Sequence, residues 1–177
     1  MQLDRRTWTV GALLAAASPA AAQTSPRAED VATLDGVIKA YYEVVSGPAG
    51  QPRDWARDRS LHHPQAQVVI VGDGPDGRLV ANVMTLAEYH ERNAGLGGAR
   101  GFFEREIHRV TETHGAVTHV WSTYEWETTE DGPVGGRGVN SIHLVYDGER
   151  WWITSWMFDG RNDAPPVPAE YLPPDAR

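Results

Sequence analysis

The chain contains no cysteine. This absence excludes disulfide bonds, cysteine-ligated zinc and a thiol nucleophile. Basic residues are also few, because 16 lysines and arginines stand against 24 aspartates and glutamates, which gives a formal net charge of −8. Nucleic-acid phosphates and anionic lipid surfaces repel a chain with this balance. We therefore expect its partner to be a small molecule or a protein, and not a nucleic acid.

The apolar run over residues 10–17 is too short for a membrane-spanning helix. It follows Arg5 and Arg6 and precedes small residues that end at Ala22. This order is typical of a signal peptide, and the paired arginines are similar to those of twin-arginine signals. We expect a signal peptide over residues 1–22, export to the periplasm or the exterior, and no stable membrane span after processing. The alternative is a cytosolic protein with an apolar N-terminus.

The short motifs of zinc proteases, EF-hands, P-loop proteins, dinucleotide-binding proteins and serine hydrolases are all absent. We accordingly expect no cofactor and no metal. Glu106, His108 and His119 would share one face of a sheet. A convex sheet surface, however, lacks the surrounding groups that hold metal ligands in place.

The 177 residues suffice for one ordinary domain. We expect a flexible leader over 23–30, the domain over 31–160 and a proline-rich extended tail over 161–177. Apolar residues at helical spacing predict helices over 31–45 and 54–61, and the capping-box pair Thr85 and Glu88 predicts another from 85 to 93. β-branched runs predict strands at 67–71 and 78–83, and four more β-type segments lie between 101 and 159.

A two-residue turn at His114-Gly115 would set the register of the first long hairpin. Glu104 and Glu106 then share one face, and Arg105 and Tyr124 lie on the other. Buried carboxylates without partners are costly. We therefore expect the glutamate face to be convex and the Arg105 face to cover the helix.

A second turn at Asp147-Gly148 would place Asn140 opposite Ser155 on the concave side. His143, Trp152 and Trp156 would then point outward. Because exposed aromatic patches mark interfaces, we expect a homodimer there, or packing of the tail alone.

Helices followed by long strands indicate an α+β fold. This order, with RDW at 53–55, HP at 63–64, GFFEREIHRV at 101–110, HVWSTYE at 119–125 and GVNSIHLVYDGERWWI at 138–153, resembles the SnoaL-like branch of the nuclear transport factor 2-like (NTF2-like) superfamily. The resemblance implies a cone-shaped fold in which a curved antiparallel sheet wraps a long N-terminal helix around one pocket, often in a dimer. The superfamily contains isomerases, dehydratases, cyclases and members that only bind, so fold alone does not give the function.

The candidate catalytic residues are His63, Tyr124 and Arg105. His63 titrates in the range of acid–base work, while Arg105 and Tyr124 would stabilise an enolate or another oxyanion. Each has an alternative: Arg105 pairs with Glu43 or Asp54, and His63 only ends a helix before Pro64. The expected ligand contacts are Tyr41, Trp55, Arg105, Tyr124, Asn140 and Ser155. The tyrosines and Trp55 could instead be core, and Asn140 and Ser155 could bond only to each other.

We therefore expect an exported domain that binds a small, partly apolar ligand with a carbonyl or carboxylate group. Cofactor-free proton transfer of the isomerase or lyase type would suit such a pocket. The alternative is a non-catalytic module of the cell envelope that dimerises or binds a protein.

Overall fold

The computed structural model describes residues 25–176, so the predicted signal peptide lies outside the described residues. The helices are α1 (Ala28–Val31), α2 (Leu34–Val45), α3 (Trp55–Leu61) and α4 (Leu86–Arg92). The strands are β1 (His62–Asp73), β2 (Leu79–Thr85), β3 (Phe103–His114), β4 (Val117–Glu127), β5 (Gly136–Tyr146) and β6 (Trp151–Asp159). Two short 3-10 turns, η1 (Ala169–Tyr171) and η2 (Pro174–Ala176), follow in the tail.

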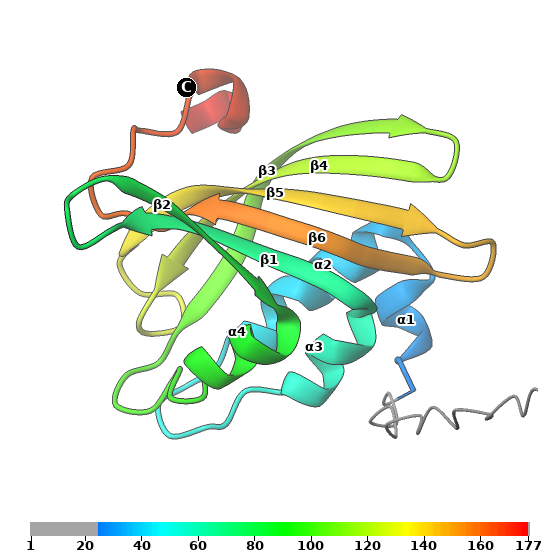
Figure 1. Ribbon diagram of the computed structural model, residues 1–177, viewed down its shortest axis with the longest axis horizontal. Coiled ribbons are helices and arrows are strands. Elements are labelled where there is room, and N and C mark those ends of the chain that lie inside the picture. The colour runs from blue at the N-terminus through cyan, green and yellow to red at the C-terminus, as the bar shows by residue number, and fades with distance from the viewer. Residues whose placement is uncertain (1–24, 177) are drawn as a thin grey trace, which may run out of the picture.

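The six strands form one sheet in the order β2-β1-β6-β5-β4-β3. It curves over α2, and the helices lie together on its concave side (Figure 1). The predicted α+β fold, a curved sheet wrapped around an N-terminal helix, is confirmed. One pairing differs from the expected antiparallel sheet, because β1 and β6 run parallel.

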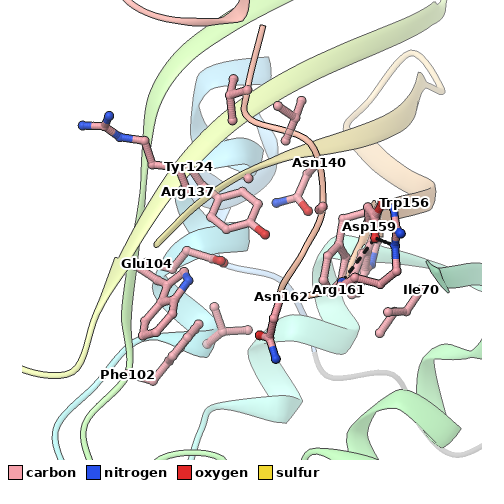
Figure 2. Close-up of a pocket in the computed structure, with 18 of the residues that line it drawn as sticks. Ile70, Phe102, Glu104, Tyr124, Arg137, Asn140, Trp156, Asp159, Arg161 and Asn162 are labelled. Carbon is pink, nitrogen blue, oxygen red and sulfur yellow. Dashed lines mark hydrogen bonds and ion pairs between the residues drawn. The ribbon is translucent and has the colours of Figure 1, made fainter. Parts of the chain in front are cut away.

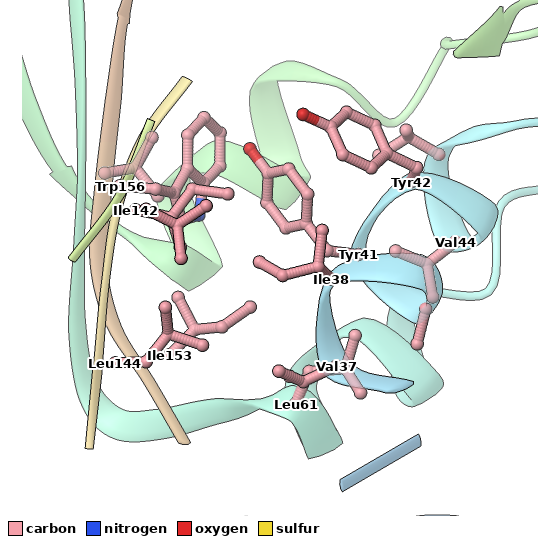
Figure 3. Close-up of a cluster of buried hydrophobic side chains, with 14 of the residues drawn as sticks. Val37, Ile38, Tyr41, Tyr42, Val44, Leu61, Ile142, Leu144, Ile153 and Trp156 are labelled. Carbon is pink, nitrogen blue, oxygen red and sulfur yellow. The ribbon is translucent and has the colours of Figure 1, made fainter. Parts of the chain in front are cut away.

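Helix α2 carries the core. Thr33 begins the helix because its side chain accepts a hydrogen bond from the backbone nitrogen of Gly36 at 2.9 Å. The apolar stripe of α2 then buries Val37 and Ile38 completely against Ile142, Leu144 and Ile153 of the sheet (Figure 3).

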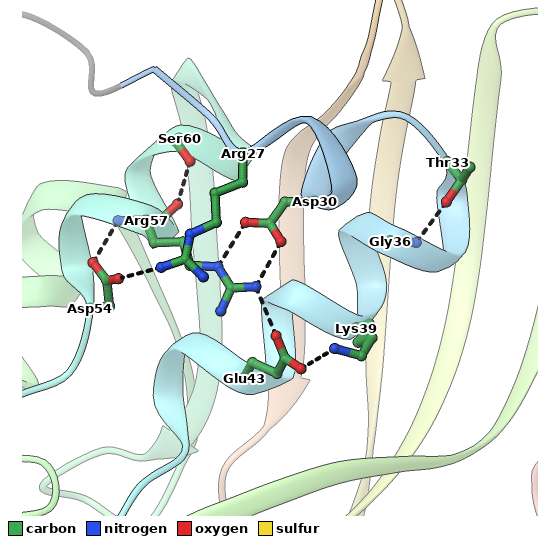
Figure 4. Close-up of polar contacts among 9 residues, drawn as sticks. All are labelled: Arg27, Asp30, Thr33, Gly36, Lys39, Glu43, Asp54, Arg57 and Ser60. Atoms are coloured by element: carbon green, nitrogen blue, oxygen red, sulfur yellow. Dashed lines mark hydrogen bonds and ion pairs between the residues drawn. The ribbon is translucent and has the colours of Figure 1, made fainter.

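Arg57 of α3 ties the first three helices together. Its guanidinium donates to both carboxylate oxygens of Asp30 at 2.7 Å and to Glu43 at 2.7 Å (Figure 4). Glu43 also pairs with Lys39, and Asp54 pairs with Arg27 at 3.6 Å. Neither acid therefore serves as the partner that the sequence suggested for Arg105.

A β-bulge in β3 overturns part of the predicted hairpin register. The two-residue loop is Gly115-Ala116, one residue later than predicted, which still leaves the same β4 side chains facing the helix. Between Glu106 and His108, however, the pairing shifts by one residue, so that Glu106 lies opposite Tyr124 and Arg105 opposite Glu125. Since alternate residues point to opposite faces, this shift turns Glu104 and Glu106 inward and Arg105 outward.

A second bulge, between His143 and Leu144, changes the last hairpin in the same way. Leu144 lies opposite Ile153, but Ile142 lies opposite Trp156 and His143 opposite Ser155. Trp156 is consequently buried on the concave side, with 3% of its surface exposed. Ser155 lies on the outer face instead, so the predicted pairing of Asn140 with Ser155 is wrong.

The tail covers part of the outer face. The Thr123 hydroxyl donates to the Tyr171 carbonyl at 2.6 Å, and the Tyr171 ring packs on Trp121 with centroids 5.6 Å apart. Trp152 donates to Asp147 at 2.6 Å and lies beneath the Arg150 guanidinium. Tail and loop contacts therefore account for two of the outer aromatic side chains. Within residues 25–176, no helix has the length and apolar character needed to span a bilayer.

Candidate functional site

A cavity of about 530 Å³ lies between the concave face of the sheet, the helices and the first residues of the tail. Its walls combine aromatic and apolar side chains with polar groups on α3, β3, β4, β5 and β6, after α4 and in the tail. Figure 2 shows the segment around Asn162 passing across this space. Size and lining are those of a site for a small organic molecule.

Glu104 is one of three acidic residues in the cavity wall, with Asp58 and Asp159. The backbone nitrogen of Glu104 donates to the Ser46 hydroxyl at 2.9 Å, which fixes this part of β3 beside the end of α2. No hydrogen-bond or ion-pair partner of the Glu104 carboxyl is found in the described part of the chain. Burial disfavours the ionised form and raises the pKa of Glu104 to about 8. Its remaining accessible surface faces the cavity, where Figure 2 shows the side chain beside the ring of Tyr124.

Three tyrosines, Tyr41, Tyr89 and Tyr124, also line the cavity. Burial raises the pKa of each, and the nearby charge of Glu104 adds to the effect. Their hydroxyls therefore stay protonated at neutral pH and can donate hydrogen bonds. Gly138 makes room for one of them, because a Cβ there would meet the Tyr124 ring carbon Cζ at 2.5 Å.

A buried Asp58–His90 pair lies at the end of the cavity formed by α3 and α4. Nε2 of His90 is 2.6 Å from the Asp58 carboxylate, and only 3% of Asp58 is exposed. On the other side, Trp156 donates to Nε2 of His62 at 3.1 Å, so Nδ1 of His62 carries the proton that it donates to the Asp58 carbonyl at 2.8 Å. These bonds hold Asp58 in one orientation at the cavity wall.

Asn140 of β5 completes the polar lining. Its Nδ2 donates to the Tyr42 hydroxyl at 3.2 Å, and that hydroxyl is 2.7 Å from the Ser122 hydroxyl. Asn140 itself is 3% exposed and borders the cavity. Among residues 25–176, no group of three or more metal-ligating side chains is placed to hold a metal ion.

Comparison with known proteins relates this architecture to solved structures. No family model and no curated protein matches the chain. A protein of unknown function from Mycobacterium tuberculosis matches with a TM-score of 0.50 and 15% identity, over 80% of this chain and 79% of that one. An NTF2-like superfamily protein from Salmonella enterica matches with a TM-score of 0.48 and 11% identity, over 74% and 92%. An NTF2-like protein of unknown function from Methylobacillus flagellatus matches with a TM-score of 0.46 and 14% identity, over 72% of this chain and 93% of that one.

Two of these three structural neighbours are described as NTF2-like proteins. At these identities the likeness concerns the fold alone.

The cavity brings together three of the residues singled out in the sequence: Tyr41, Tyr124 and Asn140. Trp55 lies behind the wall, where its ring stacks on His90 at 4.7 Å. Ser155 is on the outer face.

Arg105 and His63 are also outside the cavity. Arg105 donates to Glu125 at 2.9 Å and to Glu127 at 3.1 Å, with half of its side chain exposed. The predicted ion pair of Arg105 is thus present, but with acids of β4. The exposed His63 accepts a hydrogen bond from the Gln65 backbone through Nδ1, and its ring contacts Trp152. The placement of both residues in the pocket is therefore wrong.

Sequence reasoning missed Glu104, Asp58, Tyr89 and His90. Glu104 was assigned to the wrong face, because alternation alone cannot reveal a bulge. One signal for Asp58 was present, since Asp58 and His62 are four residues apart and therefore adjacent on a helical surface. The partner of Asp58 on α4 is 32 residues away and gives no local signal.

The mouth of the cavity holds two arginines, and each is paired with an acid. Arg161 pairs with Asp159 at 2.6 Å and with Asp163 at 3.6 Å. Arg137 donates through Nε to Glu125 at 2.6 Å. Among the described residues that line the cavity, no arginine without an acidic partner is therefore available to an anionic ligand.

Proposed function

We propose that this protein binds a small, partly apolar carbonyl compound in the cavity and transfers a proton on it without a cofactor, with Glu104 as the acid–base group. The observation that carries the proposal is the Glu104 carboxyl, which borders an aromatic cavity and has no partner of its own among the described residues. Glu104 is half-buried, and an acid with a raised pKa and no partner in a cavity wall is typical of a catalytic group.

The pKa of Glu104 suits this role. At a value of about 8, both protonation states are populated near neutral pH. A general acid–base group is most effective when its pKa lies close to the working pH. Glu104 can then accept a proton and return it in the same turnover.

The reaction follows from the groups that face the cavity. The Glu104 carboxylate takes a proton from the carbon next to the substrate carbonyl, so that the C–H bond breaks and the electron pair moves to the carbonyl oxygen. The Tyr124 hydroxyl, which stays protonated, donates a hydrogen bond to the resulting enolate oxygen. Glu104 then returns the proton to another carbon in an isomerisation, or to a departing hydroxyl in an elimination.

The ligand class is set by charge. The sequence suggested a carbonyl or a carboxylate ligand, and the carboxylate depended on Arg105 in the pocket. With Arg105 outside, and with Arg137 and Arg161 paired to acids, the acidic groups Glu104 and Asp58 disfavour an anion. An uncharged carbonyl compound fits the remaining set of donors and aromatic walls.

Proton exchange tests this function directly. The purified protein is incubated in D2O with a panel of uncharged aryl and cyclic ketones, including 1-tetralone, and exchange of the α-protons is followed by NMR. We expect Glu104→Gln to lower the catalysed rate at least about a hundredfold. Glu112→Gln, which removes an exposed carboxylate from the same strand, is the matched control and keeps the rate. Failure of the wild type to catalyse exchange of any ketone, or equal rates for Glu104→Gln, would reject the proposal.

The second candidate is a module that dimerises or binds a protein of the cell envelope through the outer face of the sheet. Its support is a row of apolar side chains across three strands, in which Val69 pairs with Val83 and with Met157. Val83 and Met157 are 59% and 37% exposed. Sedimentation of the wild type and of Met157→Glu tests it, because a dimer formed through this row dissociates when charges are placed in it.

A further inference from the structure

A chain of hydrogen bonds leads from the cavity to the surface through the concave face. Asn140 donates to the Tyr42 hydroxyl at 3.2 Å, which lies 2.7 Å from the Ser122 hydroxyl. The Ser122 hydroxyl donates to Glu106 at 2.5 Å. The Glu106 carboxylate is held by Nε of Arg109 at 3.0 Å, and Arg109 also reaches Asp35 on α2 at 2.6 Å.

The ion pair at the far end fixes the direction of every bond in this chain. Glu106 forms an ion pair with the Arg109 guanidinium, and a carboxylate in such a pair only accepts hydrogen bonds. The single proton of the Ser122 hydroxyl must therefore point to Glu106. Tyr42 must then give its own proton to Ser122, which leaves the Tyr42 oxygen as an acceptor toward Asn140.

This direction decides which end of the Asn140 amide faces the cavity. The NH2 group has to point to Tyr42, because the opposite orientation would bring two acceptor oxygens together inside the protein. The Asn140 carbonyl oxygen therefore remains for the cavity, and no partner for it is found in the described part of the chain. Figure 2 shows the Asn140 amide beside the segment that crosses the cavity.

We propose that the Asn140 oxygen selects a ligand with a hydroxyl group, so that the preferred compound is a hydroxy ketone, and that Glu106 is the positioning residue that sets this selection. The ketone part rests on the proposed function, whereas the hydroxyl part rests on the hydrogen-bond chain alone. A hydroxyl can donate to the Asn140 oxygen, and a methyl ether of the same shape cannot. A buried acceptor left without a donor penalises the ether.

A matched pair of ligands tests the proposal: 6-hydroxy-1-tetralone and 6-methoxy-1-tetralone, with calorimetric dissociation constants for each. We expect the wild type to bind the hydroxy compound at least about tenfold more tightly than the ether. Glu112→Gln is the control and keeps this ratio.

Glu106→Gln gives the sharpest outcome. Arg109 continues to bind the oxygen of the new amide, so its NH2 group donates to Ser122. Each proton of the chain then reverses: Ser122 donates to Tyr42, Tyr42 donates to Asn140, and the Asn140 NH2 group faces the cavity. We expect the ligand preference to fall to about one or to invert in favour of the ether. A purely structural role of Glu106 would weaken both ligands equally and leave the ratio unchanged.

If circular dichroism shows that Glu106→Gln is unfolded, Asn140→Ala is the second variant. We expect it to remove the preference for the hydroxy compound as well. Equal affinities of the wild type for the two compounds, or an unchanged tenfold ratio in either variant, would overturn the inference. A tenfold preference for the hydroxy compound without α-proton exchange would support this inference and reject the proposed function. Exchange of the α-protons without a preference between the two ligands would support the proposed function and reject this inference.

Discussion

The burial of Glu104 predicts an unusual dependence of stability on pH. The pKa of this carboxyl is about 8 in the folded chain, against an ordinary value of 4.5. Below pH 4.5 the group is protonated in both states and has no effect. Between pH 4.5 and about pH 8 the folded state binds more protons than the unfolded state, so the free energy of unfolding falls as the pH rises.

Replacing Glu104 by Gln removes this loss, because the amide has a similar shape and does not titrate. Each pKa unit corresponds to about 1.4 kcal/mol. Glu104→Gln should therefore raise the free energy of unfolding relative to wild type by up to about 1 kcal/mol at pH 5, about 3 kcal/mol at pH 7 and about 5 kcal/mol at pH 9. The increase of this difference with pH, more than any single value, is the expected sign of the raised pKa of Glu104.

Urea unfolding monitored by tryptophan fluorescence at these three pH values measures the difference. Glu112→Gln is the matched control, and its free energy of unfolding should stay close to that of the wild type at all three pH values. If the difference for Glu104→Gln did not change with pH, the carboxyl would titrate as in water. Glu104 would then lack the raised pKa that suits an acid–base group.

Four further outcomes are expected. Gly138→Ala displaces the Tyr124 ring. It should lower the free energy of unfolding measured with urea by about 1–3 kcal/mol, and it should also weaken the calorimetric affinity for ketones. Asp58→Ala leaves His90 without its partner and costs about 3–5 kcal/mol in the same unfolding assay. Arg105→Gln costs about 1–3 kcal/mol through the hydrogen bonds lost by Glu125 and Glu127, but leaves calorimetric ketone affinity unchanged. The predicted signal peptide over residues 1–22 implies that mass spectrometry of the protein purified from its native cells finds Gln23 as the first residue, and an intact Met1 would exclude cleavage.

Much of the fold followed from local patterns in the sequence. The apolar stripe predicted a helix over 31–45, and α2 is the core helix. It begins at Leu34, because Thr33 caps it. The Thr85 and Glu88 capping box begins α4 as predicted. The prediction of which β4 side chains face inward was also correct, because the pairing of β4 with β5 has no irregularity. These side chains are Thr118, Val120, Ser122 and Tyr124.

The site was harder to predict because bulges shift which residues share a face. One extra residue near Ile107 moved Glu104 into the cavity and Arg105 out of it, and neither side chain signals this choice by its own type. The bulge beside Leu144 had the same effect on Trp156 and Ser155. The Asp58–His90 pair depends on the packing of two helices that are distant in sequence, which periodicity within either helix does not specify.

The bulge in β3 also has an evolutionary consequence. Acidic and basic side chains alternate along this strand, with Glu104, Arg105 and Glu106 in succession. A strand out of step by one residue here would present a guanidinium to the cavity where a carboxyl now stands. A short insertion or deletion in β3 is therefore a route by which a protein of this fold changes from uncharged to anionic ligands, while its helices, core and sheet order stay the same.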